Sequence, residues 1–296
     1  MRGAAVANDG SWQATPEAAT TVTMHGVGSI GTVFKGVPVA IQRGNTGVRA
    51  IKNSLFISQL VREEFILKSF KGCPHILQCY DGQYSEENGK ITYNLIMEFA
   101  PHGTLETLIN INNPLPEILV RTYTRMILKG LSYIHHEDIV HCDLKPENIL
   151  LFPPSSSSQS PSCENFNLKI ADFGLAMTKE EKIINDEGCC FPKFRFRGTP
   201  YYMSPESVRG VIDTALDVWS LGCLVIEMII GMPAWWKLET IEEVMFTLAM
   251  ERKSPEIPNS VSEECGDFLR KCLVVDPRGR WTVDMLLNHP FIILSD

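Results

Sequence analysis

The sequence predicts an α+β protein with two lobes, a small β-rich lobe followed by a larger helical lobe. Short runs of β-branched residues fill the chain between about residues 20 and 98, with one amphipathic segment among them. From residue 103 onward, apolar residues recur mostly at helical spacing. A chain of 296 residues has room for two such lobes, and we expect a cleft between the packed layers.

Composition and charge narrow the class of protein. Hydrophobic residues at 44% and charged residues at 21% are ordinary for a globular chain and exclude wholesale disorder. The net charge of −8 disfavours nonspecific binding to nucleic acids or anionic membranes, because both need a basic face. The nine cysteines form no Cys-x-x-Cys pair, which disfavours a zinc cage or a disulfide framework and favours a reducing compartment.

The elements of the first lobe follow a tail. Residues 1–19 read as flexible and lack the apolar core of a signal peptide. We expect strands in the runs GTVFKG, VPVAIQ, VRAIK and ITYNLIMEF. The segment LVREEFILKSF predicts an amphipathic helix, in which Leu60, Glu64 and Leu67 are spaced for opposite faces.

The second lobe combines helices with one hairpin. Residues 119–135 keep apolar side chains at helical spacing. The apolar runs 148–152 and 167–173 predict two strands of a surface hairpin. A low-complexity Ser/Pro stretch at 153–165 separates them, and we interpret it as a solvated surface insertion rather than a phosphorylation switch. The most apolar stretch, residues 221–236, is too short to span a membrane and predicts a helix buried on all sides.

A glycine-rich segment opens the first lobe. Residues 25–33 read His-Gly-Val-Gly-Ser-Ile-Gly-Thr-Val, and glycines in this pattern let backbone N–H groups approach phosphates closely. A dinucleotide-binding oxidoreductase would need a helix directly after Gly31, whereas the following Thr-Val-Phe favours a strand. A plain glycine hairpin is the alternative that this motif leaves open.

Lys52 ends the VRAIK strand and is a candidate for binding nucleotide phosphates, held by a glutamate from the helix. Glu63 is the expected partner, and Glu64 is the rival beside it. A second run, VAIQ, resembles the same strand with Gln42 in the place of the lysine. We favour Lys52, because the chain between Gly31 and Gln42 is too short for a strand, a turn and another strand.

Two polar motifs flank the predicted hairpin. Residues 141–148 read HCDLKPEN directly before an apolar strand. Asp143 could accept a hydroxyl proton, and Lys145 could neutralise a transferring phosphoryl group. Asn148 could bind a metal ion, and the Asp172-Phe173-Gly174 run places a carboxylate at a strand end, which suits Mg²⁺.

These motifs, in this order, resemble those of the eukaryotic protein kinases. The resemblance includes GTPYYMSPE at 198–206 and DVWSLG at 217–222, and it covers residues 20–292, with a hinge at 98–102 and the second lobe at 103–292. HCDLKPEN and GTPYY resemble serine/threonine kinases. Longer runs, among them DVWSLGCLVIEM, look like plant mitogen-activated protein kinase kinase kinases, whose substrates would be mitogen-activated protein kinase kinases.

The resemblance implies a two-lobed protein kinase fold that uses ATP and Mg²⁺. It implies that Lys52 pairs with Glu63 and contacts the phosphates, and that Asp143 orients and deprotonates the substrate hydroxyl. It further implies that Asn148 and Asp172 hold the metal ions. The residues implied to bind ATP are His25, Gly26, Val27, Gly28, Ser29, Gly31, Val33, Ala50, Lys52, Glu98 and Ala100.

The same resemblance implies several structural contacts and a location. Glu206 and Arg280 would form a buried ion pair, and Asp217 would anchor the backbone of the catalytic loop. A protein of this kind is expected in the cytoplasm, with the nucleus as a second compartment. The stacked hydrophobic spine would include Leu67, His141 and Phe173.

Cys142 departs from the family pattern. It stands where most kinases have an arginine that pairs with a phosphorylated residue, and a thiol cannot make that ion pair. Between Gly174 and Arg197, Thr178 is the only hydroxyl residue. We therefore hypothesise that activity does not depend on phosphorylation of this segment in the usual way. Its alternating basic and aromatic residues 193–197 read as a solvated strand edge or as a contact for an acidic substrate. Gln42 and Cys142 keep open the alternative of a pseudokinase that binds nucleotide and acts as a scaffold.

Overall fold

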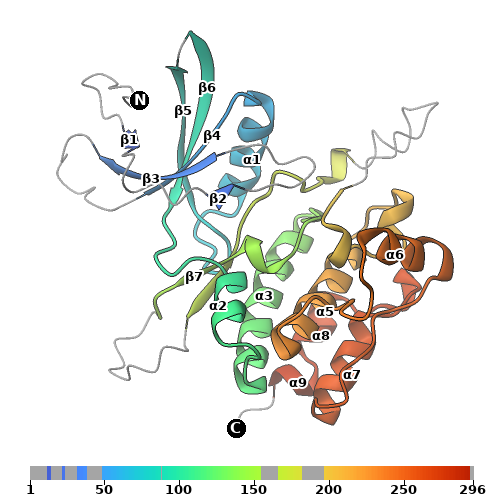
Figure 1. Ribbon diagram of the computed structural model, residues 1–296. Helices are drawn as coiled ribbons and strands as arrows, with labels where there is room; N and C mark the ends of the chain where they lie inside the picture. The colour runs from blue at the N-terminus through green and yellow to red at the C-terminus, as the bar shows by residue number, and fades with distance from the viewer. Residues whose placement is uncertain are drawn as a thin grey trace, which may run out of the picture. The chain divides into compact units, whose positions relative to one another are not determined.

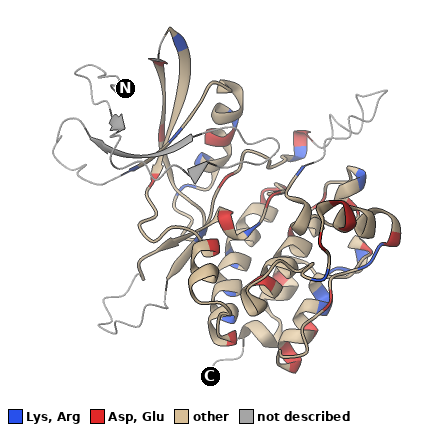
Figure 2. Ribbon diagram, viewed as in Figure 1, with Lys and Arg blue, Asp and Glu red and all other residues tan. Residues whose placement is uncertain are grey.

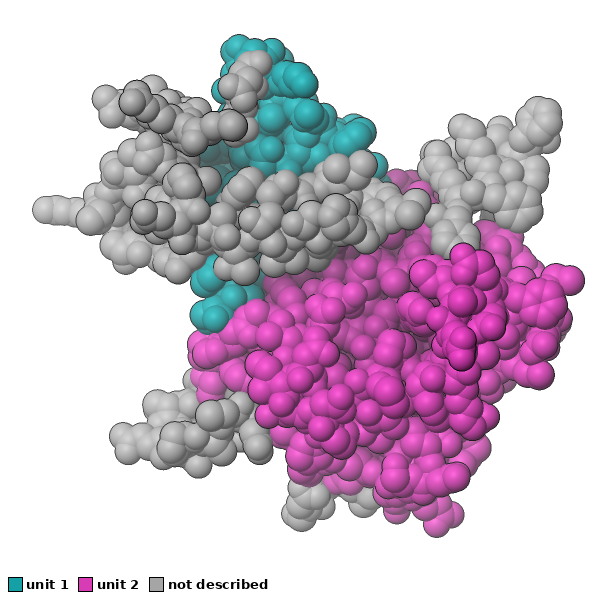
Figure 3. All heavy atoms as spheres, viewed as in Figure 1, with its two compact units in different colours: residues 1–101 teal, residues 102–296 magenta. Residues whose placement is uncertain are grey.

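The computed structural model describes residues 12–14, 22–23, 32–38, 49–87, 89–154, 166–181 and 197–293. The chain divides into two compact units, Met1–Pro101 and His102–Asp296, which Figure 3 shows in different colours. The first unit contains an antiparallel sheet and a helix. The second contains helices and a hairpin (Figure 1). An α+β chain with a β-rich first part and a helical second part was predicted, and this is confirmed.

The first unit is built on a six-stranded antiparallel sheet in the order β1-β3-β4-β6-β5, with β2 paired to β3. The predicted strands GTVFKG, VRAIK and ITYNLIMEF correspond to β3, β4 and β6, while VPVAIQ lies mostly outside the described residues. β5 was not predicted. The strands are β1 Trp12–Ala14, β2 Val22–Thr23, β3 Thr32–Pro38, β4 Arg49–Ser54, β5 Cys79–Glu87 and β6 Lys90–Glu98.

Helix α1, Ile57–Ser69, is the predicted amphipathic helix and packs against β5 and β6. Leu60 and Leu67 are buried, as expected. The assignment of Glu64 to the opposite face was wrong, because its side chain is also buried. Lys68 and the Tyr93 hydroxyl donate to its carboxylate, and these contacts offset the cost of removing a charge from water.

The second unit consists mainly of helices. Four of them, α2, α6, α7 and α8, begin at a threonine or serine whose hydroxyl accepts a backbone N–H of the first turn. The α-helices are α2 Leu105–Ile111, α3 Glu117–His136, α5 Ala215–Ile230, α6 Ile241–Phe246, α7 Glu263–Cys272, α8 Val283–Leu287 and α9 Pro290–Ile293. Short turns are η2 Pro146–Asn148, η3 Pro200–Tyr202, η4 Ser207–Arg209, η5 Thr247–Glu251 and η6 Pro277–Gly279.

Helix α5 forms the centre of this unit. Every residue from Leu216 to Met228 is buried, and the helix packs against α3 and α7 (Figure 1). The prediction of a helix buried on all sides is confirmed for residues 221–228, whereas residues 231–236 of the predicted stretch lie beyond the end of α5. None of the helices in the described ranges combines the length and hydropathy that a membrane span requires.

The predicted hairpin is formed by β7, Ile149–Phe152, and β8, Asn167–Ile170. The two strands pair antiparallel over their full length, from Ile149 opposite Ile170 to Phe152 opposite Asn167. Beyond the last pair, Asn167 Nδ2 donates to the carbonyl of Pro153 at 3.0 Å. Most of the Ser/Pro insertion, residues 155–165, lies outside the described part of the chain.

Candidate active site

The first unit contains a buried ion pair between Lys52 and Glu63. Lys52 extends from β4, which lies between β3 and β6, and its Nζ is 2.7 Å from Glu63 Oε2 and 3.0 Å from Oε1. The two residues are 5% and 2% exposed. Glu63 rather than Glu64 is therefore the partner of this lysine. Two opposite charges this close in a dry site hold the ammonium group in one position.

The strand pairing supports the choice of Lys52 over Gln42. In the β3–β4 register, Lys52 lies opposite Val33, which is the last residue of the glycine-rich segment. Gln42 itself lies outside the described residues. The same holds for six residues expected to bind ATP: His25, Gly26, Val27, Gly28, Ser29 and Gly31.

The other residues expected to bind ATP lie on the sheet or directly after it. Val33 is in β3, and its backbone alone is described. Ala50 of β4 pairs with Met97 of β6, and Glu98 ends β6, where its carboxylate accepts the N–H of Gln78 at 2.7 Å. Ala100 follows β6 as a half-buried residue.

In the second unit, Asp217 fixes the backbone of the loop at residues 141–148. Its Oδ2 accepts the N–H of His141 at 2.9 Å, and its Oδ1 accepts the N–H of Cys142 at 3.0 Å. His135, near the end of α3, contacts Oδ2 through Nε2 at 2.9 Å. The anchor predicted for this carboxylate is present. Since Asp217 lies in the first turn of α5, the loop is attached to a helix that is buried from Leu216 to Met228.

The carboxylate of Asp143 lies at the centre of a hydrogen-bond network. Oδ1 accepts the Thr199 hydroxyl at 2.8 Å, and Oδ2 lies 3.2 Å from Lys145 Nζ. Lys145 also donates to the Thr199 hydroxyl at 2.9 Å, which closes a triangle of three side chains. Asn148 Nδ2 reaches the backbone carbonyl of Asp143 at 2.8 Å and Oδ2 at 3.2 Å. A carboxylate held in this way has a fixed position, which is what the acceptance of a proton from a substrate requires.

Thr199 was not among the predicted site residues. The sequence feature that could have indicated its role is its position directly after Gly198 in the motif GTPYYMSPE. Gly198 adopts φ +103, and a Cβ there would meet the carbonyl of Cys142 at 2.6 Å. The glycine therefore lets residues 198–206 approach the loop at 141–148, where the Thr199 hydroxyl contacts Asp143.

Asn148 and Asp172 can hold a divalent cation. Asn148 is fully buried, and its Oδ1 has no hydrogen-bond donor among the described residues. Asp172 follows β8 with φ +61, and the N–H of Ala171 beside it donates to the carbonyl of Asn148 at 2.9 Å. An orphaned amide oxygen near a carboxylate is a hard oxygen donor set, which fits Mg²⁺.

Two further predicted contacts are present in the second unit. The rings of His141 and Phe173 meet edge to face with centroids 5.0 Å apart. Arg280 binds Glu206 through two N–H groups, at 2.6 Å and 3.1 Å, and its side chain is 0% exposed. Arg280 also donates to the carbonyl of Ala215, so the pair connects α5 with the segment that follows η6.

Cys142, which stands where most kinases have an arginine, packs in an apolar cluster. Its neighbours there are Val140, Met177 and Leu216. The segment after Gly174 is connected elsewhere, because Arg197 donates to the carbonyls of two residues in it, Leu175 and Ala176, at 3.0 and 3.4 Å. The interpretation of Arg197 as part of a solvated strand edge was therefore wrong, since it is a half-buried donor to backbone. Residues 193–196 lie outside the described residues.

Glu227 and Tyr202 form a second buried polar contact, in which the Tyr202 hydroxyl donates to Glu227 Oε2 at 2.6 Å. Burial raises the pKa of Glu227 to about 7, and the charges of Glu147 and Glu106 add to this effect. Burial also raises the pKa of Tyr202 well above its ordinary value, so its hydroxyl remains a donor.

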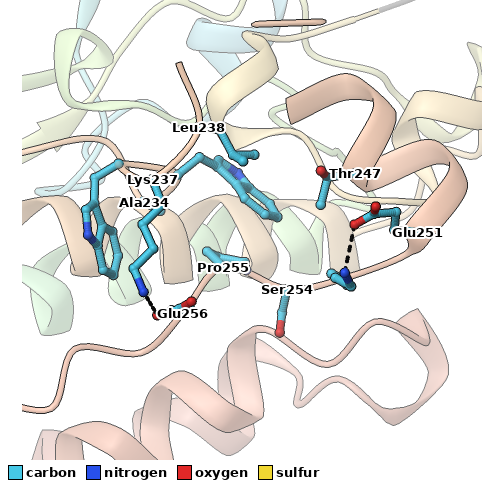
Figure 4. Close-up of a pocket in the computed structure, with 11 residues that line it drawn as sticks. Ala234, Lys237, Leu238, Thr247, Glu251, Ser254, Pro255 and Glu256 are labelled. Atoms are coloured by element: carbon cyan, nitrogen blue, oxygen red, sulfur yellow. Dashed lines mark hydrogen bonds and ion pairs between the residues drawn. The ribbon is translucent and has the colours of Figure 1, made fainter. Parts of the chain in front are cut away.

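A cavity of about 230 Å³ lies elsewhere in the second unit (Figure 4). Ion pairs between Lys237 and Glu256 and between Lys253 and Glu251 occur in its lining. No predicted site residue lines it. Charged residues of both signs are scattered along the helices of this unit (Figure 2).

Comparison with known proteins adds three findings. The model of the protein kinase domain family matches residues 20–292. Mitogen-activated protein kinase kinase kinase 20 of Arabidopsis thaliana is 39% identical over 243 residues, which are 80% of this chain and 67% of the relative. Mitogen-activated protein kinase kinase kinase 17 of the same plant is 36% identical over 277 residues, which are 90% of this chain and 67% of the relative.

Proposed function

The chain belongs to the protein kinase family, and from that premise we propose that it transfers the terminal phosphoryl group of ATP to serine or threonine residues of mitogen-activated protein kinase kinases. The observation that carries the proposal is the network in which Lys145 and Thr199 hold the buried carboxylate of Asp143. The names of the plant relatives support the class of substrate.

In this proposal Asp143 orients the substrate hydroxyl and accepts its proton. Lys145, 3.2 Å from that carboxylate, neutralises charge on the transferring phosphoryl oxygens. Lys52, held by Glu63, binds the phosphates nearer the nucleoside. Because phosphoryl transfer needs little covalent help, these positions and charges account for most of the catalysis.

Asn148 and Asp172 are the proposed metal ligands. When bound, Mg²⁺ would neutralise negative charge on the phosphates. The orphaned Oδ1 of Asn148 supports this assignment, because a buried acceptor without a donor is costly unless a ligand occupies it. Asn148 also donates to Asp143, so the same side chain connects the proton acceptor to the metal site.

We further propose that activity does not require a phosphate on the segment after Gly174. None of the described residues in the apolar cluster around Cys142 is a cation, and Arg197 donates to the carbonyls of Leu175 and Ala176. A pseudokinase is the alternative function, and nothing in the described part of the chain favours it. Lys52, Asp143, Asn148 and Asp172 together retain the chemistry that transfer needs.

The test compares the purified chain with Asp143→Asn in transfer of labelled phosphate from Mg·ATP to a panel of mitogen-activated protein kinase kinases. We expect labelled serine or threonine with the wild type and a loss of at least about 100-fold in Asp143→Asn, which removes the proton acceptor. Asp138→Asn is the matched control, because Asp138 is exposed and a neighbour in sequence. Transfer retained by Asp143→Asn, or ATP binding without transfer in the wild type, would contradict the proposal.

A further inference from the structure

The face of the sheet that α1 covers carries a second polar contact beside the Lys52–Glu63 pair. In the β4–β6 register Lys52 lies opposite Leu95, and Ser54 lies opposite Tyr93. Side chains two apart on a strand point to the same face, so Lys52 and Tyr93 share this face. Two adjacent strands therefore present a lysine and a tyrosine to one helix.

Consecutive glutamates of α1 bind these two side chains. Glu63 binds Lys52 through both carboxylate oxygens, and Glu64 accepts a hydrogen bond from the Tyr93 hydroxyl. Glu64 Oε1 also lies 2.6 Å from Lys68, one helical turn later, so each oxygen of this carboxylate has a donor. Burial and the neighbouring glutamate raise the pKa of Tyr93, which keeps its hydroxyl protonated as a donor.

The neighbouring strand leaves room for this contact. Gly82 of β5 pairs with Leu95 and lies on the same face of the sheet. A Cβ at Gly82 would collide with both the Tyr93 hydroxyl and the Glu64 carboxylate. The backbone of Gly82 is not left-handed, so the close approach of Tyr93 and Glu64, and not the chain direction, requires glycine here.

The two contacts together restrict the rotation of α1 about its axis more than either contact alone. Consecutive residues of an α-helix point about 100° apart, so Glu63 and Glu64 reach their strands in different directions. Without the contact at Glu64, the packing of apolar side chains such as Leu60 and Leu67 would be left to oppose a rotation of the helix that moves Glu63 away from Lys52. The hydrogen bond from the Tyr93 hydroxyl to Glu64 opposes that rotation.

We propose that Tyr93 is a positioning residue that holds α1 on the sheet and thereby keeps Glu63 in contact with Lys52. The proposal rests on the proposed function, in which Lys52 binds the phosphates of ATP. It adds a contact that holds α1 on the sheet: Tyr93 binds Glu64, and Gly82 leaves the space that this contact needs.

The test uses Tyr93→Phe, which removes the hydroxyl and keeps the ring. Tyr84→Phe is the matched control, because its ring contacts that of Tyr93 at 4.9 Å while the residue is 66% exposed. We expect the Kd for Mg·ATP to rise about 3- to 10-fold in Tyr93→Phe, the net range of one hydrogen bond, and to change less than about twofold in Tyr84→Phe.

A double-mutant cycle with Glu63→Gln separates positioning from a general effect on folding. If Tyr93 acts through Glu63, adding Tyr93→Phe to Glu63→Gln should change the Kd by less than about twofold. Equal losses with and without Glu63→Gln would overturn the positioning role. So would an unchanged Kd in Tyr93→Phe alone.

Backbone hydrogen exchange of residues 57–69 without nucleotide gives a readout independent of ATP. We expect faster exchange in α1 for Tyr93→Phe and no change for Tyr84→Phe. Faster exchange spread evenly over β4, β5 and β6, or no change in α1, would contradict the role of the contact between Tyr93 and Glu64. If the wild type bound no Mg·ATP, the proposed function would fail, and the exchange of α1 would still decide the role of Tyr93.

Discussion

Replacing Glu227 with glutamine should change how the stability of the second unit depends on pH. The folded chain raises the pKa of this carboxyl from an ordinary 4.5 to about 7, because the side chain is buried within α5. Between these two values the folded state holds a proton that the unfolded state has released. This contribution to stability is therefore fully present below pH 4.5 and is lost as the pH rises through 7.

The size of the effect follows from the two pKa values. They differ by about 2.5, and at about 1.4 kcal/mol for each factor of ten the loss between pH 4.5 and pH 8 is about 3 kcal/mol. Glutamine does not ionise, and its carbonyl oxygen can still accept the Tyr202 hydroxyl. Any constant cost of the new amide cancels when the variant is compared with the wild type at two pH values.

Urea unfolding followed by tryptophan fluorescence measures this difference, since Trp219, Trp235, Trp236 and Trp281 all belong to the second unit. We expect Glu227→Gln to gain about 2.5 kcal/mol relative to the wild type between pH 5 and pH 8. The exposed Glu242 provides the control variant Glu242→Gln, which should show no such gain. A difference between Glu227→Gln and the wild type that stayed flat over this range would refute the reasoning.

Two further predictions concern the second unit. Arg280→Met leaves the carboxylate of Glu206 buried without its partner and should lower the free energy of unfolding by about 3–5 kcal/mol, measured by urea unfolding. The exposed Arg278→Met is its control, and equal losses in the two variants would count against the buried ion pair. Asp217→Asn deprives one backbone N–H of the loop at 141–148 of its acceptor, and we expect kcat/KM to fall about 10- to 100-fold as the catalytic loop shifts. Steady-state kinetics against the exposed Asp213→Asn would test this, and unchanged kinetics would show that the loop holds its position without Asp217.

Much of the fold could be predicted because it depends on local patterns. The β-branched runs around Lys52 and Tyr93, the helical spacing of α3 and the predominantly apolar character of α5 each specify an element within a short stretch. β5 lacked such a pattern, since CYDGQYSEE is polar and contains a glycine. That strand forms by pairing with β6, which sequence periodicity does not record.

The residues of the candidate site also fall into those that the sequence identified and those that it did not. The residues of HCDLKPEN and Asp172 are recognisable because their spacing along the chain is itself informative. Thr199 and Glu64 could not be assigned, because each depends on a partner far along the chain: Thr199 contacts Asp143, and Glu64 contacts Tyr93. Side chains such as these acquire their roles only when distant segments meet.

The hairpin of β7 and β8 bears on how the chain tolerates insertions. Asn148 and Asp172 flank the hairpin, and its ladder together with the bond between Ala171 and Asn148 sets the spacing of these two residues. At the other end, the contact from Asn167 to Pro153 closes the base of the connection. Each doubling in the length of a flexible loop costs only about 0.6 kcal/mol in closure entropy. We therefore expect that the chain between Pro153 and Asn167 can be lengthened or shortened while the ladder of β7 and β8 keeps the spacing of Asn148 and Asp172.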